Sequence, residues 1–322
     1  MKTKISSVLI IIILIITTSL FLIFPEDVMS SVIFSISIWK DSLIPSLFPF
    51  FLISELLIHY GFVELVGELL QNIMNKFFSL PGEASFVLIG SMISGFPSSS
   101  KYIKELLRNK QVNEKEASYL LKFNHFSNPL FVIGTVGTLL LNNRYIGTLI
   151  LIVHILSNFI IAFIFKPKQV KYKKEKISLK LGINKMHKKR VQDSSSFSEV
   201  LSKSIFKTIQ TLLLLLGIIT TFIILNTLLT QIFKLDAITS SILNGILEMT
   251  GGIKNVSMLN ITLSIKASII TFFISFGGFS IHMQVMSILS DTNIKYLPYL
   301  LARIIHGCIA STIIFIILTF II

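Results

Sequence analysis

Long stretches without any charged side chain are the feature that most limits what this chain can fold into. Each is close to the 20 or so residues that a helix needs to cross the hydrocarbon region of a membrane. Only 14% of the 322 residues are charged, against about 25% in soluble domains. We therefore expect an integral membrane protein. The uncharged stretches lie at 5–25, 84–100, 123–143, 145–165, 208–233, 267–290 and 304–322.

Two further apolar segments contain charged residues. The first, 43–63, contains Glu55, and the second, 237–265, is interrupted by Glu248 and a pair of glycines. About half a dozen Leu, Ile or Phe residues offset the cost of inserting one carboxylate, so 43–63 can still enter the membrane. We interpret 1–25 as a first transmembrane span rather than a signal peptide, because its apolar run is too long and no small-residue cleavage motif follows it.

The positive charge of the chain is concentrated in one segment. Residues 166–207 hold thirteen Lys or Arg and three acids, although the whole chain carries a formal charge of only +13. A Lys/Arg-rich loop marks the cytoplasmic side of a membrane protein, so we place 166–204, 101–122 and the amino-terminal end there. The loop lacks apolar periodicity and is expected to be flexible. Its basic side chains suit anionic lipid headgroups, and we expect no nucleic-acid partner.

Residues 62–78 have a different pattern from the spans. One face is polar and the other apolar, which is typical of a helix that lies at the membrane interface or against the bundle. The polar stripe is Glu64, Glu68, Gln71 and Asn75, and the apolar stripe is Phe62, Val66, Leu69, Ile73 and Phe77.

The most informative motif is Ser-Gly-Phe-Pro-Ser-Ser-Ser-Lys at 94–101. Gly95 can end a helix, Pro97 cannot continue one, and Ser98 and Ser99 can cap the next. A break inside an apolar run exposes backbone N–H groups, which together with hydroxyls can form a site for a polar or anionic group. The alternative is an ordinary helix end at the membrane surface. Because 84–97 is short for a crossing, we favour a segment that re-enters.

A related break occurs at 276–284, where Gly277 and Gly278 interrupt an apolar run. The polar residues Ser280, His282 and Gln284 follow where lipid-compatible ones would be expected. After each break comes Tyr-Leu-Leu, then a base and a histidine: Lys122 and His125 in the first half, Arg303 and His306 in the second. This shared order predicts two structural repeats, 40–165 and 205–322, on either side of the basic loop.

Further polar residues lie close to these motifs. Asn113 and Glu116 form a capping-box pattern that predicts a helix starting near residue 114. That helix should kink or break at Asn128-Pro129, with Asn124 and Asn128 on one face. Arg303 and His306 are i, i+3 neighbours on another helix.

Ionisable residues inside a membrane are costly and are therefore candidates for function. The alternative is a structural role: Glu248 with Arg303 or Lys266 would form a buried pair, and His59 and His154 would be hydrogen-bonded packing residues. There is no phosphate-binding loop, no HExxH motif and one cysteine, Cys308. We therefore expect no enzymatic activity, no cofactor and no metal site.

At these motifs the chain resembles the YlbJ-type family of sporulation integral membrane proteins, with its nucleoside-recognition Gate region. The similar segments are PSLFPFFLISELLI (45–58), FVLIGSMISGFPSSSK (86–101), NHFSNPLFVIG (124–134) and SFGGFSIHMQVMSILSDTNIKYLPYLLARIIHG (275–307). The resemblance implies a transporter-like fold and a role in sporulation connected with cortex assembly. The polar motifs with which nucleoside transporters hold base and ribose have no clear counterpart, so the family label indicates ancestry more than substrate.

Together these features predict an all-α polytopic membrane bundle of about eight spans in two pseudo-repeats with broken or re-entrant helices. Our leading hypothesis is a permease for a polar or anionic small solute. The alternative is a non-transporting scaffold that recruits envelope or cortex enzymes. The residues predicted to bind the solute are Gly95, Pro97, Ser98, Ser99, Asn124, Asn128, Gly277, Gly278, Ser280, His282, Gln284, Arg303 and His306.

Overall fold

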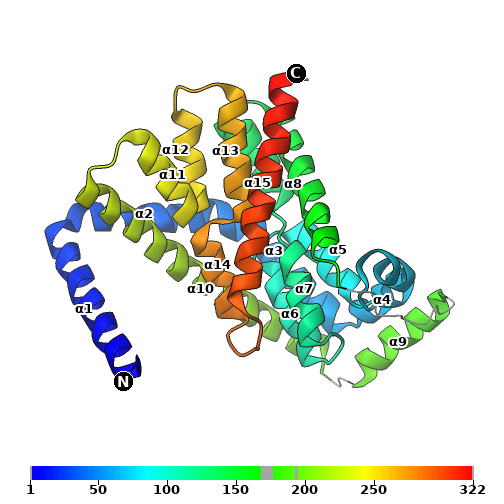
Figure 1. The fold of residues 1–322 in the computed structure, drawn as a ribbon. Helices are drawn as coiled ribbons and strands as arrows, with labels where there is room; N and C mark the ends of the chain where they lie inside the picture. Colours follow the sequence, from blue (N-terminus) through cyan, green and yellow to red (C-terminus); the bar gives the residue numbers. More distant parts are fainter. Residues whose placement is uncertain (1, 168–176, 193–194, 321–322) are drawn as a thin grey trace.

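The computed structural model describes residues 2–167, 177–192 and 195–320. Part of the basic loop, at 168–176 and 193–194, and the last two residues of the predicted final span lie outside the described residues. The predicted fold class is confirmed, because the molecule is 84% helical and the described residues contain no strand. Figure 1 shows most of the helices packed into a bundle, whereas α1 stands apart from it on the left and joins it through α2. The amino-terminus and α9 lie towards the lower end and the carboxy-terminus at the top.

Eighteen helical elements make up the described chain. Those of the first half are α1 (Lys2–Ile23), α2 (Pro25–Ile38), η1 (Trp39–Leu43), α3 (Ile44–His59), α4 (Phe62–Ile73), η2 (Met74–Phe78), α5 (Ala84–Ser94), α6 (Ser98–Arg108), α7 (Glu114–Phe123), η3 (Phe131–Leu140) and α8 (Arg144–Ile164). Those that follow are α9 (Leu179–Gln192), α10 (Phe197–Phe233), α11 (Ala237–Leu247), α12 (Met249–Met258), α13 (Leu263–Phe276), α14 (Gly278–Ile288) and α15 (Tyr296–Phe320). The η elements are π-helical.

Four helical segments among the described residues are long and apolar enough to cross a membrane: α8, α10, the α13–α14 pair and α15. The count rises to six if two sharply bent pairs are each taken as one span. The first bent pair, α1 with α2, turns by 98° before Pro25, and the second, α3 with α4, turns by 83°. Shorter apolar helices add α5, η3 and α11. This count agrees roughly with the predicted eight spans.

Side chains that face away from the bundle are mostly apolar. Along α1, each residue from Val8 to Ile16 exposes roughly half of its surface, and large exposed apolar residues also follow α8, α10 and α15. Such faces are unsuited to water and suited to lipid. The described elements therefore form a multi-pass membrane protein, whose buried apolar core joins α4–α8 to α12–α15.

A second apolar cluster lies where α2, η1 and α3 meet the long helix α10. Polar contacts fix this arrangement: Trp39 Nε1 donates to the carbonyl of Leu212 at 2.7 Å, and the hydroxyls of Ser31 and Thr227 are 2.8 Å apart. The first and second halves of the chain are thus packed together along α10 (Figure 1).

Several local predictions are confirmed. Asn113 and Glu116 form the capping box that starts α7, and residues 62–78 form a helix that is bent away from α3. The segment 84–100 is not one crossing: α5 and α6 fold back on each other, so that both Phe86 and Gly90 of α5 contact Tyr102 of α6. The two helices therefore form a hairpin at the predicted break, and its re-entry into the membrane stays a prediction.

Residues 101–122, which we placed on the cytoplasmic side, form most of α6 and nearly all of α7, and α7 begins at the predicted residue 114. Another prediction is wrong. The basic loop contains a helix, α9, where we expected flexible chain. This helix packs on α4 because Gly182 lets it approach Leu65 and Glu68, and because Lys185 forms an ion pair with the buried Glu68 at 2.7 Å. The polar stripe of 62–78 thus faces α9, at least at Glu68.

Candidate functional site

The segment between α7 and η3, residues 124–130, connects the two predicted breaks. Its first five residues are not helical, so the prediction that Asn124 and Asn128 share a helix face is wrong. The break at Asn128-Pro129 is confirmed. Asn128 Oδ1 accepts hydrogen bonds from the backbone N–H groups of Leu130 and Phe131, at 2.8 and 3.3 Å, and so starts η3 in place of the missing helical bonds.

The first break, between α5 and α6, lies directly on this segment. The backbone N–H of Phe96 donates to the carbonyl of Phe126 at 2.7 Å, and Asn128 Nδ2 donates to the carbonyl of Ser94 at 3.4 Å. Gly95 has a positive φ of 78°. A Cβ at Gly95 would lie 2.5 Å from the backbone N of Asn128, so only glycine allows this close approach.

The second break touches the same segment from the other half of the chain. Gly277, with φ 92°, separates α13 from α14. A Cβ at Gly277 would lie 2.6 Å from Nε2 of His125. The His125 ring also stacks on Phe96, with centroids 4.7 Å apart and planes at 21°, and its Nδ1 is 3.1 Å from the Tyr299 hydroxyl. His125 therefore contacts both breaks and α15.

The second break has a further neighbour, the junction of α11 and α12. Gly278 lies against the backbone of Leu247 and Met249. Glu248 caps α12 by accepting from the N–H groups of Thr250 and Gly251, at 3.1 and 2.8 Å. The suggested pairing of Glu248 with Arg303 or Lys266 is therefore wrong. In the first half, the turn between α5 and α6 thus packs against the break at 124–128. In the second half, the junction of α11 and α12 packs against the break between α13 and α14.

Four buried histidines surround the junction: His125, His154, His282 and His306. His154 Nε2 accepts from the N–H of Ser127 at 3.0 Å, so its proton is on Nδ1, which donates to Ser275 Oγ at 2.9 Å. His282 Nε2 donates to the carbonyl of Phe276 at 2.8 Å. The prediction that His154 is a hydrogen-bonded packing residue is confirmed, and its hydrogen bonds with Ser127 and Ser275 also place it at the junction.

Arg303 is fully buried and lies beside these histidines. It donates to the carbonyl of Lys122, and its Nη1 is 3.4 Å from Asn158 Oδ1 and 2.9 Å from His306 Nδ1. The predicted i, i+3 contact with His306 is confirmed. No carboxylate lies within ion-pair distance of Arg303 in the part of the chain that the structure describes. Its charge is thus held by neutral dipoles alone.

We define the central cluster as the residues that meet here, together with the buried Asn124 and Ser280, which are close neighbours along the chain of His125 and of Gly278. The residues that meet are His125, Ser127, Asn128, His154, Asn158, Ser275, Gly277, His282, Tyr299, Arg303 and His306. Its depth follows from the helices that carry it. His154 is ten residues from each end of α8, which corresponds to about 15 Å along the helix axis. A bilayer about 30 Å thick that is spanned by the whole of α8 would therefore have the cluster near its midplane.

Several buried atoms of the central cluster have no hydrogen-bond partner among the described residues. They are Asn124 Oδ1, His125 Nε2, Ser127 Oγ, Ser280 Oγ and Arg303 Nε. Leaving such groups unpaired costs about 1–3 kcal/mol each. Unpaired buried atoms occur elsewhere in the described chain as well, for example at Ser79, Ser85 and Thr208, but these five lie in one cluster that also holds a buried arginine, which is the composition of a polar binding site. No group of three or more His, Cys, Asp and Glu side chains in the described chain is arranged to hold a metal ion.

A cavity of about 260 Å³ reaches the central cluster from one side. Its wall contains Phe96, Ser127 and Asn128 from the first half and Met249 and Thr250 from the second. It is slightly smaller than the 300–1,000 Å³ of drug-sized ligand sites and suits a small solute. The cavity thus lies between the first break and the tip of the α11–α12 pair.

The predicted site residues divide into two groups. Nine of them lie at or beside the central cluster: Gly95, Asn124, Asn128, Gly277, Gly278, Ser280, His282, Arg303 and His306. For the other four, Pro97, Ser98, Ser99 and Gln284, the structure shows burial or proximity to a break but no contact with the cluster. Their role in binding stays a prediction. The predicted binding residues did not include six members of the central cluster, namely His125, Ser127, His154, Asn158, Ser275 and Tyr299. All but Tyr299 are polar residues inside apolar stretches, which was a signal that could have found them.

The comparisons with known proteins agree with the architecture. Residues 42–143 match the Gate family, described as nucleoside recognition. The chain is 34% identical over 301 residues to the sporulation integral membrane protein YlbJ of Bacillus subtilis (strain 168), a match that covers 86% of this chain and 74% of that protein. No solved structure matches the chain. The chain therefore belongs to the family of the sporulation integral membrane protein YlbJ, and it contains a Gate domain.

Proposed function

We propose that this protein is a permease that moves a small polar or anionic solute through the central cluster. The observation that carries the proposal is the convergence of two helix breaks on residues 124–128, together with five buried polar atoms that have no partner there. Transporters bind their solutes near the bilayer midplane with backbone and side chains of interrupted helices. The depth and composition of the central cluster suit that role.

The charge of the central cluster favours an anionic or strongly polar solute. Arg303 is fully buried without a carboxylate among the described residues, and an uncompensated buried charge is costly. An anionic group of the solute would neutralise it. The neighbouring histidines and serines would then supply neutral hydrogen bonds, so the site binds its solute without transforming it.

The family supplies the biological setting of this proposal. Its named relative is a sporulation protein, and we propose that the solute is needed for spore formation, at the step of cortex assembly. The basic loop at 166–204 would contact anionic lipid headgroups on the cytoplasmic side. A mutant lacking the protein should then make spores with reduced cortex, measured by muropeptide content.

Removing unpaired hydroxyls tests the proposal. We would reconstitute the full chain in vesicles and measure uptake of radiolabelled nucleosides, dicarboxylates and inorganic anions. Ser127→Ala and Ser280→Ala each remove a buried hydroxyl without a partner, which should leave the fold unchanged or stabilise it. If these hydroxyls bind the solute, uptake should fall about tenfold or more, which is the effect of losing one good hydrogen bond.

Ser85→Ala is the matched control. Its hydroxyl is also buried and without a partner among the described residues, but Ser85 lies at the start of α5, ten residues from Gly95. Uptake by this variant should equal that of the wild type. Equal uptake by all three variants for every solute that the wild type transports would contradict the proposed site, and a wild type that transports none would favour the scaffold.

A further inference from the structure

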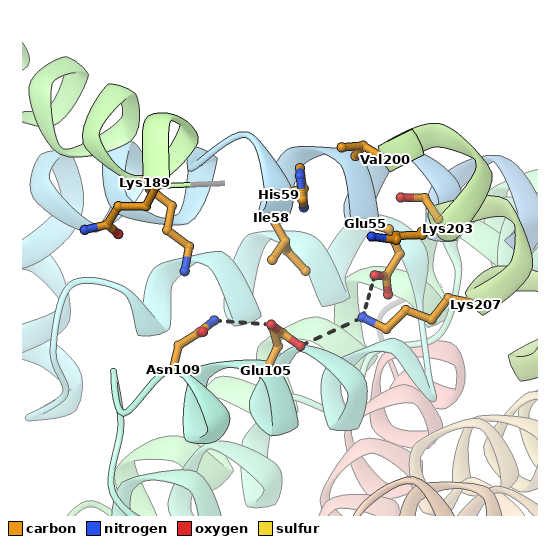
Figure 2. Close-up of a pocket in the computed structure, with 11 residues that line it drawn as sticks. Glu55, Ile58, His59, Glu105, Asn109, Lys189, Val200, Lys203 and Lys207 are labelled. Atoms are coloured by element: carbon orange, nitrogen blue, oxygen red, sulfur yellow. Dashed lines mark hydrogen bonds and ion pairs between the residues drawn. The ribbon is translucent and has the colours of Figure 1, made fainter. Parts of the chain in front are cut away.

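A second polar cavity, of about 560 Å³, lies away from the central cluster between α3, α6, α9 and α10. Figure 2 shows that side chains from all four helices point into it. Charged and amide groups dominate the lining, which consists of Glu55, Ile58, His59, Glu105, Asn109, Lys189, Gln192, Val200, Lys203, Ser204 and Lys207. Nothing in the proposed permease site uses these residues.

Both carboxylates of this cavity are already neutralised by lysines. Glu55 is buried, and its two oxygens lie 2.8 Å from the ammonium groups of Lys101 and Lys207. Lys207 also lies 3.9 Å from Glu105, which accepts a hydrogen bond from Asn109 at 3.3 Å. The dashed lines in Figure 2 join the cavity members of this network. The carboxylates therefore hold lysines in place and do not form a cation site.

Positive charge remains after these pairs are made. The ammonium of Lys189 points from α9 into the space facing α6 (Figure 2), and among the described residues it has no ion-pair partner. Lys203 is paired with Glu199 four residues earlier on α10, but both side chains are largely exposed and such a pair is weak. The cavity thus presents lysines from two helices, with the side-chain amides of Asn109 and Gln192 as neutral donors.

We propose that this cavity binds a phosphate group, held by Lys189 on α9, by Lys203 and Lys207 on α10 and by the neighbouring amides. Lysine is a common phosphate ligand because its ammonium is a compact charge with three donors. The volume is sufficient for an organic phosphate. The group can belong to a soluble cytoplasmic molecule or to a lipid headgroup, because the cavity lies beside the charged start of α10, directly before its apolar part.

A phosphate bound in the cavity would affect the α5–α6 pair at the first break through the ion pair of Glu55. Lys207 holds Glu55, and Glu55 also holds Lys101 near the start of α6. A phosphate that engages Lys207 competes with Glu55 for it. The site is therefore placed to influence the α5–α6 pair, although phosphate binding does not depend on the protein being a permease.

Calorimetric titration of the full chain in detergent with inorganic phosphate, at constant ionic strength, tests the proposal. Lys189→Gln is the decisive variant, because it removes a charge that has no ion-pair partner in the described chain and should not affect folding. We expect it to weaken binding about tenfold or more. Lys180→Gln makes the same change on the same helix outside the cavity and should change affinity less than about twofold.

A second arm identifies the source of the phosphate. The protein is placed in nanodiscs of phosphatidylcholine with or without phosphatidylglycerol, and the titration is repeated. Loss of phosphate binding only with phosphatidylglycerol assigns the cavity to a headgroup, and unchanged binding assigns it to a soluble ligand; both support the site. No binding of phosphate in detergent or in either nanodisc, or equal weakening by Lys180→Gln and Lys189→Gln, would overturn the proposal.

Discussion

The imidazole of His125 lies against Gly277 so closely that a Cβ on the glycine would be 2.6 Å from Nε2. These residues are 152 positions apart and belong to different halves of the chain. Their contact is the point at which the broken α13–α14 segment meets the segment between α7 and η3.

Gly277→Ala should therefore destabilise the protein. The added methyl would overpack against the imidazole, at about 1–3 kcal/mol, and would also force a non-glycine residue to adopt φ 92°. We expect a clearly lower midpoint of thermal unfolding in detergent. Gly217→Ala is the control, because nothing lies within 4 Å of its Cβ position in α10 and alanine favours a helix by about 1 kcal/mol.

A second substitution separates the two causes of this loss. His125→Ala removes the clash but leaves the positive φ, so the double variant Gly277→Ala with His125→Ala should be more stable than the sum of the single effects predicts. Strict additivity of the two changes would show that the close contact carries no energy.

Arg303→Lys should destabilise the central cluster although it keeps the charge. The guanidinium reaches acceptors on three elements, namely the Lys122 carbonyl, Asn158 and His306. An ammonium is too compact to contact all three, and each buried acceptor left unpaired costs about 1–3 kcal/mol. Thermal unfolding would measure the loss. A stability equal to that of the wild type would mean that these contacts are not made.

Much of this architecture could be predicted from local sequence. Charge-free stretches located the long helices, the Asn113–Glu116 spacing located the start of α7, and glycines at 95 and 277 located the two breaks. Each of these signals acts within a few residues, because capping and left-handed backbone conformations are local properties.

Contacts between distant segments could not be predicted in the same way. Helical spacing placed Asn124 and Asn128 on one face, but tertiary contacts with Ser94 and Phe96 hold this segment out of a helix. Similarly, α9 has little apolar periodicity, and its packing on α4 depends on the ion pair between Lys185 and the buried Glu68. The two copies of the Tyr-Leu-Leu motif lie in helices of different kinds: α7 ends at Phe123, directly before the 124–128 break, whereas α15 continues from Tyr296 to Phe320. The shared motif therefore did not predict a shared helix.

Glu55→Gln should be one of the most destabilising conservative changes in the chain. It leaves the largely buried Lys101 without its carboxylate partner, and breaking a buried ion pair from one side costs about 3–5 kcal/mol. Adding Lys101→Met should restore part of the lost stability, because no charge is then left unpaired. If the double variant unfolds at the same or a lower temperature than Glu55→Gln alone, the pair does not act as inferred.

The surface contact of Asp291 should behave differently and depend on pH. A hydrogen bond from Lys104, followed by one from Arg108, lowers the pKa of the Asp291 carboxyl below its ordinary value of 3.8. Because the folded state lowers this pKa, the contact stabilises the protein above pH 3.8 and the effect is lost as the pH falls through the folded value. The difference in unfolding temperature between wild type and Asp291→Asn should therefore be small at neutral pH and vanish in acid.

Asn128→Asp should separate the fold from transport at the first break. The carboxylate can still accept from the N–H groups of Leu130 and Phe131, so the start of η3 is kept. It can no longer donate to the Ser94 carbonyl, and it adds a negative charge beside the 260 Å³ cavity. For an anionic solute we expect uptake to fall about tenfold or more with a modest loss of stability, since repulsion acts in a poorly solvated site.

Asn128→Ala, which loses the cap, should instead destabilise the fold by about 0.5–2 kcal/mol. Unchanged uptake of an anionic solute by Asn128→Asp would remove this asparagine from the solute site and leave it with a structural role in the α5–α6 contact.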